Sequence, residues 1–156
     1  MSVTRSGDFK ANAAKVENGA KRGLILAGML VAQRGSQKAP RKTGRLKRNI
    51  SHGEPYVIGD RRYAIDVGTN VEYAKAQEFG TGPYEIYPKT KRALAFDWLG
   101  APAGMTPSKS GKFIFAHVSH PGVKAQPYLR PALRESKGDI ERLILKSVLG
   151  ALRKKQ

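Results

Sequence analysis

The chain has 156 residues and no cysteine, which excludes both a disulfide framework and a thiolate metal site. Its 29 Lys and Arg residues against 12 Asp and Glu give a formal charge of +17, which indicates a polyanion or an acidic protein as partner. The longest apolar run, residues 23–32, is too short to cross a bilayer, so we expect a soluble, intracellular protein. The length fits a single domain of residues 1–156.

Apolar residues recur at intervals of three and four from about residue 8 to residue 33, which predicts a long N-terminal helix. Pro40 stops this helix, which we place within residues 1–38. Gly19, Gly23 and Gly28 each cost about 1 kcal/mol relative to alanine inside a helix. We therefore expect a kink in this helix, or a neighbouring subunit that holds it.

The middle of the chain changes to the alternating pattern of strands. Apolar residues from Tyr56 to Val67 alternate with polar ones around Gly59, which predicts a β-hairpin. A short helix, a third strand and a second strand pair should follow, over residues 71–79, 84–87, 93–98 and 112–118. The connection over residues 100–111 is long for a hairpin and is either a mobile arm or a contact loop.

The C-terminal region should contain a short helix over residues 127–134 and a last helix within residues 137–156, with Asp139 as its N-cap. The order of elements predicts an α+β fold. We expect a mainly antiparallel sheet, with the long N-terminal helix and the C-terminal helices packed on one face of it.

The most basic segment has seven cations within residues 34–48 and no acid. A cluster that lacks acidic neighbours in sequence should face solvent, phosphate or an acidic protein ring. We prefer a DNA or partner-ring contact over a merely solvated surface. The sequence contains no motif for base-specific recognition of nucleic acid. Any DNA binding should therefore involve the phosphate backbone. The candidate contact residues are Arg41, Lys42, Arg45, Lys47 and Arg48.

Aromatic residues near two glycine- and proline-rich stretches are predicted as core or subunit-contact residues, and not as base-stacking ones. Residues 127–131 contain two prolines, and this rigid setting suits an anchor at an interface. The candidate interface residues are Tyr73, Phe79, Tyr84, Tyr128 and Leu129.

Catalytic residue patterns are weak in this chain. His117 and His120 lack a third metal ligand nearby in sequence, and residues 80–83 lack the lysine of a phosphate-binding loop. Glu72, Glu78 and Glu85 are interpreted as ion-pair partners. We expect no catalytic residue, no metal and no cofactor.

Three segments, residues 39–50, 67–83 and 120–133, resemble the head-tail joining family of long-tailed bacteriophages (siphophages), which includes small neck and tail-completion proteins. Asn49 departs mildly from the family pattern, where serine is common. The matching positions are Ala39, Pro40, Thr43, Gly44, Leu46, Ile50, Val67, Gly68, Tyr73, Ala74, Glu78, Phe79, Gly80, Thr81, Gly82, His120, Pro121, Gly122, Gln126, Pro127, Leu129, Arg130, Pro131 and Ala132.

The resemblance implies a non-enzymatic virion protein that joins the head-completion ring to the tail terminator or tail tube. It also implies a homo-oligomeric ring around the DNA channel, and we prefer a hexamer over a dodecamer. Two alternatives from other classes stay open. One is a free nucleic-acid-binding protein without sequence specificity, and the other is a metal-dependent nuclease that uses Glu72, Glu78 and a histidine.

Overall fold

The computed structural model describes residues 5–41 and 43–153, which form two compact units. Unit 1 contains the described residues up to Phe79 and from Gln126 onward, and unit 2 contains Gly80–Ala125. Helices and small antiparallel strand pairs make up the protein, so the predicted α+β class is confirmed. In the described part of the chain, no helix has a stretch that is long and apolar enough to span a membrane.

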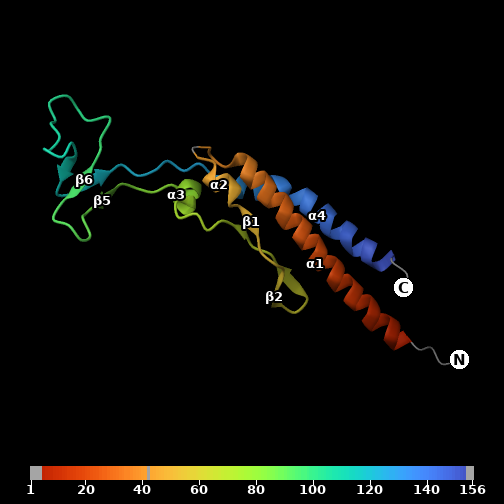
Figure 1. The fold of residues 1–156 in the computed structure, drawn as a ribbon. Coiled ribbons are helices and arrows are strands. Elements are labelled where there is room, and N and C mark those ends of the chain that lie inside the picture. Colours follow the sequence, from red (N-terminus) through yellow and green to blue (C-terminus); the bar gives the residue numbers. More distant parts are fainter. Residues whose placement is uncertain (1–4, 42, 154–156) are drawn as a thin grey trace. The chain divides into compact units, whose positions relative to one another are not determined.

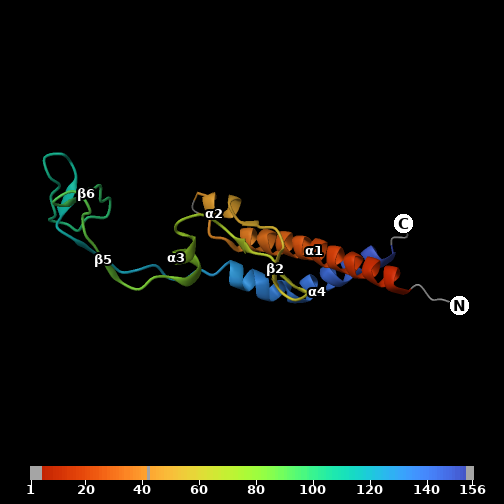
Figure 2. The same ribbon diagram turned by 90° about the horizontal axis from the view of Figure 1, so that it is seen from below.

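Two long helices dominate unit 1 and pack side by side in antiparallel directions (Figures 1 and 2). They are α1 (Arg5–Lys38) and α4 (Leu129–Arg153). A Cβ atom on Gly19 would lie 2.7 Å from Val148 Cα, and one on Gly23 would lie 2.6 Å from Ile144 Cα. These two glycines therefore allow α4 of the same chain to approach α1 closely. The sequence pattern did not predict this reason for the glycines in the helix.

The two helices predicted after residue 127 are one continuous helix, α4, so the predicted break between them is wrong. Ser136 is completely buried where we expected the break. Its Oγ donates to the Ala132 carbonyl at 2.6 Å and accepts from Arg34 at 2.9 Å, so the helix continues through this position. Asp139 accordingly lies inside α4 and is not an N-cap.

The strands form four separate two-stranded antiparallel pairs and not one sheet. In unit 1, the predicted hairpin is confirmed as β2 (Tyr56–Gly59) paired with β3 (Arg62–Ala64). The short strands β1 (Ser51–His52) and β4 (Val67–Gly68) form the second pair. Both β1 and β4 lie against α1, and the short helices of this unit are α2 (Arg45–Arg48) and α3 (Ala74–Phe79).

Unit 2 contains the other two strand pairs. They are β5 (Tyr84–Ile86) with β8 (Val118–His120), and β6 (Leu94–Phe96) with β7 (Phe113–Phe115). The strand predicted over residues 112–118 is divided between β7 and β8, which pair with different partners. The long connection between β6 and β7 closes in a turn where the Ser108 amide donates to the Lys112 carbonyl at 2.8 Å.

The core of unit 1 unites the three segments that resemble the phage family. Its buried residues come from residues 39–50, 67–83 and 120–133, and Ile50 and Leu129 pack against them. Leu46 is 2 % exposed and Tyr128 is 1 % exposed. These three segments, which we call the signature segments, therefore converge because they build one core. The buried residues are Ala39, Leu46, Val71, Ala74 and Tyr128.

Candidate assembly surfaces

Glu78 is the buried acid of unit 1, only 4 % exposed, and it lies at the end of α3. Its carboxylate accepts hydrogen bonds from the backbone N–H groups of Tyr128, Leu129 and Arg130, at 2.7, 3.0 and 3.0 Å. These are the free N–H groups at the start of α4. Pro131 has no N–H, and the Ala132 amide already donates to the Tyr128 carbonyl. Glu78 therefore caps α4 completely from another part of the chain.

The charge of Glu78 suits this position. Burial alone would raise the pKa of Glu78, but the three backbone hydrogen bonds and the Arg130 side chain outweigh it and lower the pKa below 4.5. The negative charge also interacts favourably with the positive N-terminal end of the helix. Arg130 Nε lies 3.2 Å from Glu78 Oε1, and the guanidinium lies over the Phe79 ring at 4.6 Å. All of these contacts are structural, which agrees with the prediction that Glu78 is an ion-pair partner.

Two glycines of the signature segments are required by a backbone crossing inside unit 2. Thr81 and Val123 exchange backbone hydrogen bonds of 2.9 and 3.2 Å. Gly122 has a φ of 88°, and a Cβ atom there would lie 2.2 Å from the Thr81 carbonyl oxygen. Gly80 has a φ of 73°. Only glycine fits both the conformation and the space at residue 122.

The basic segment is less free than the sequence indicated. Arg34 binds Asp139 at 2.5 Å and Lys38 binds Glu135 at 2.9 Å, both across the α1–α4 contact. Two of the seven cations are therefore neutralised within the chain, by acids that are not their neighbours in sequence. Their acidic partners are about a hundred residues away in sequence, so local charge counting could not find them.

Four of the five candidate contact cations remain without an ion pair among the described residues. Arg41, Arg45 and Arg48 are exposed, and Lys47 is half-buried. They lie in and just before α2, which starts after Gly44 in a left-handed conformation with a φ of 72°. The fifth candidate, Lys42, lies outside the described residues. We name these four residues, Arg41, Arg45, Lys47 and Arg48, the α2 patch.

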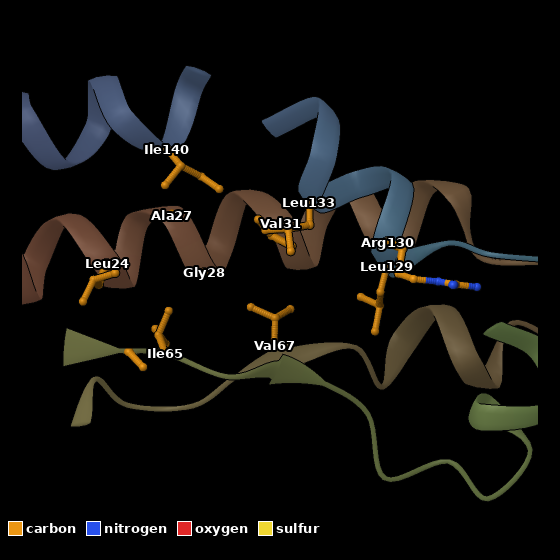
Figure 3. Close-up of a pocket in the computed structure, with 11 residues that line it drawn as sticks. Leu24, Ala27, Gly28, Val31, Ile65, Val67, Leu129, Arg130, Leu133 and Ile140 are labelled. Atoms are coloured by element: carbon orange, nitrogen blue, oxygen red, sulfur yellow. The ribbon is translucent and has the colours of Figure 1, made fainter. Parts of the chain in front are cut away.

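An apolar pocket of about 380 Å³ opens among α1, α4 and the strands of unit 1 (Figure 3). Leu24 and Val31 enter it from α1, Ile65 and Val67 from the strand side, and Ile140 from α4. Its one charged lining residue, Arg130, extends away from the space. The pocket thus offers no nucleophile or acid–base pair, and its chemistry suits an apolar side chain.

The five candidate interface residues have different surroundings. Tyr73, Phe79 and Tyr84 are exposed by 43, 59 and 47 %. Leu129 is half-buried and lines the apolar pocket. Tyr128 is a core residue of its own chain, so its ring is not an accessible contact. Burial raises the pKa of Tyr128.

The histidines of unit 2 stack on tyrosines, and His117 also lies 3.8 Å from the Glu85 carboxylate. Tyr84 and His120 have ring centroids 4.9 Å apart, and Tyr87 and His117 are 5.7 Å apart. Within residues 5–41 and 43–153, no three His, Asp or Glu side chains are close enough to hold a metal ion. The nuclease hypothesis therefore has no metal site in this part of the chain.

The protein exposes more large apolar side chains than it buries. Across the described residues, nine apolar residues are buried and twenty large ones are exposed. Monomeric proteins rarely leave extended apolar patches in water, and such patches usually mark interaction surfaces. This imbalance affects both units.

The protein is a small α+β protein with two packed helices, short strand pairs and a helix capped by Glu78. Residues of the signature segments mainly have structural roles in it. A family model described as "Bacteriophage HK97-gp10, putative tail-component" matches residues 8–80. Residues 8–80 are therefore similar to the HK97-gp10-like family of phage tail components, which confirms the predicted resemblance. The segment 120–133, which supplies Tyr128 and Arg130, lies beyond the match. No curated protein and no solved structure matches the chain significantly.

Proposed function

We propose that this chain is a non-enzymatic virion protein at the head-tail junction of a tailed phage. In this role it forms a ring around the DNA channel and joins the head-completion ring to the tail terminator or tail tube. The observation that carries the proposal is the match of residues 8–80 to a phage tail-component family. The twenty exposed large apolar residues support it, because ring assembly would cover part of this surface.

The sister-copy contact is proposed to use Tyr73, Phe79 and Tyr84 as anchors. Aromatic side chains are enriched at the centres of protein interfaces, and these three are exposed. The apolar pocket beside Leu129 is a receiving surface of suitable size for such a side chain.

The α2 patch is proposed to face DNA or an acidic ring. Six copies of a +17 chain carry about +100, whereas a channel some 40 Å tall meets only about 24 phosphates of duplex DNA. The cations must therefore be divided between the channel and other acidic partners. Contacts to the phosphate backbone alone suit a genome that slides through the channel.

The test is the assembly state and location of the protein. Negative-stain images and native mass spectra of the purified chain should show a closed ring, and labelled particles should carry it at the neck. The double variant Tyr73→Ser/Phe79→Ser should assemble poorly, whereas Met105→Ser, in the loop of unit 2, should assemble normally. A chain that stays monomeric at all concentrations and is absent from virions would overturn the proposal.

A second function, a free nucleic-acid-binding protein, is favoured by the unpaired cations of the α2 patch. It predicts tight, steeply salt-dependent DNA binding by the monomer. Absence of the chain from purified particles, together with such binding, would decide for it.

A further inference from the structure

Unit 2 lacks a buried core. None of the residues Gly80–Ala125 is buried, although all of them are described. Ordering a residue costs about 1–2 kcal/mol of backbone entropy, and small units offset this only by burying apolar surface. A unit of this kind gains stability when a partner covers it. Half of the chain's twelve aromatic residues lie here, and they are Tyr84, Tyr87, Phe96, Trp98, Phe113 and Phe115.

Aromatic residues in β6, in β7 and just after β6 line a groove in unit 2. Phe96 and Phe115 stack with ring centroids 5.5 Å apart, and Trp98 meets Phe115 edge-on at 5.8 Å. With His117 and Pro121 they line a groove of about 390 Å³ that lies wholly within unit 2. Rigid aromatic surfaces lose little entropy on binding, and tryptophan is the residue most enriched at interface centres.

The charge of unit 2 restricts the partner. The unit has five lysines and one arginine against two acids. No ion pair joins any of these six cations to another described residue, and all six are exposed. Of the two acids, Glu85 lies near His117 at 3.8 Å. A unit that carries both unpaired cations and an apolar groove is complementary to an acidic surface with an apolar anchor.

Two other possible partners, a second copy of this chain and duplex DNA, fit the groove of unit 2 less well. A sister copy is itself strongly basic, since the rest of the chain has 23 cations against 10 acids, so this contact would bring like charges together. Duplex DNA would neutralise the cations, but its phosphate backbone would not cover the groove or the fully exposed Leu99.

We infer that the aromatic groove of unit 2 docks onto a different protein of the particle, one whose contact surface is rich in Asp and Glu around an apolar protrusion. The inference rests on the proposed function, because it takes the virion as the place of binding. It assigns the aromatic groove to another protein and leaves the sister-copy contacts to Tyr73, Phe79 and Tyr84, none of which lines the groove.

The test uses the full chain in assembled particles. A photoreactive amino acid is placed at Leu99, beside the groove, or in a second experiment at Tyr73, and the cross-linked partner is identified by mass spectrometry. The probe at Leu99 should cross-link to another, acidic virion protein, and the probe at Tyr73 should cross-link to a second copy of this chain. Trp98→Ala and Lys91→Glu should each lower the yield from Leu99 at least about tenfold, whereas Met105→Ala should leave it unchanged.

Each outcome bears on a separate claim. Cross-links from Leu99 to a sister copy or to DNA, or to no partner at all in particles that contain the chain, would overturn the assignment of the groove but not the virion role. Absence of the chain from particles would overturn both. The cross-linked partner is identified in the chain that keeps Trp98 and Lys91. Misfolding of Trp98→Ala would therefore not affect the identification.

Discussion

Replacing Glu78 by Gln tests whether one buried carboxylate holds α4 in place. The carboxylate accepts three backbone N–H groups and the Arg130 side chain. Glutamine keeps one oxygen, which can accept one or two of the N–H groups, and its own NH₂ group faces the remaining donors. The charge that interacts with the helix end is also lost.

The expected loss follows from these contacts. A hydrogen bond to a charged group contributes about 1.5–3 kcal/mol, and an unsatisfied buried donor costs about 1–3 kcal/mol. Glu78→Gln should therefore lower the free energy of unfolding by about 2–4 kcal/mol. For a chain of this size, this corresponds to a fall in Tm of about 4–16 °C. Urea denaturation followed by circular dichroism would measure the first quantity, and a thermal scan the second.

The pH dependence gives an independent check. Because the pKa of Glu78 is lowered in the folded protein, its stabilisation is present above 4.5 and is lost as the pH falls through the folded value. The stability difference between the native chain and Glu78→Gln should therefore shrink as the pH is lowered below 4.5.

Glu72→Gln is the matched control, because Glu72 is exposed and should change stability by less than about 0.5 kcal/mol. If Glu78→Gln were no more destabilising than Glu72→Gln, the capping argument would be refuted. Loss of a Mg²⁺-dependent plasmid cleavage in Glu78→Gln would instead favour the nuclease alternative.

Two further predictions concern the helix contact and the α2 patch. Gly23→Ala should lower the unfolding free energy by about 1–2 kcal/mol, because the clash with α4 exceeds the gain in helix propensity. Gly138→Ala, where a Cβ atom meets nothing within 4 Å, should raise the unfolding free energy by up to about 1 kcal/mol. If denaturant titrations gave the two variants equal stability, the close packing of α1 on α4 at Gly23 would be contradicted. In DNA-binding titrations, Arg45→Gln/Arg48→Gln should reduce the slope of log K against log salt by about 2, and Lys146→Gln should leave it nearly unchanged. Equal slopes in all three proteins would exclude the α2 patch from DNA contact.

Local patterns predicted the elements well. The end of the N-terminal helix before Pro40, the hairpin of β2 and β3, and the short helix α3 all follow from periodicity and turn residues. These features depend on neighbours within a few residues, which is why the sequence alone contains them.

Long-range contacts were the part that escaped prediction. The pairing of α1 with α4, and the ion pairs of Arg34 and Lys38 that it creates, join residues about a hundred positions apart. A signal was present in the regular spacing of Gly19, Gly23 and Ala27, which leaves one helix face with small side chains. The sequence predicted Glu78 as an ion-pair partner but not as the cap of α4, because capping by a distant segment leaves no local pattern.

The pairing of α1 with α4 affects how the chain folds during synthesis. Residues 39–128 separate the two helices, so α1 leaves the ribosome long before its partner exists. Contacts between distant segments form slowly, since a long loop must close first. Until α4 arrives, the small-residue face of α1 has nothing to cover it, and the first turn of α4 in turn needs Glu78 already in position. Nascent or truncated chains therefore cannot complete unit 1, and only chains that include α4 can present its finished surface to other subunits.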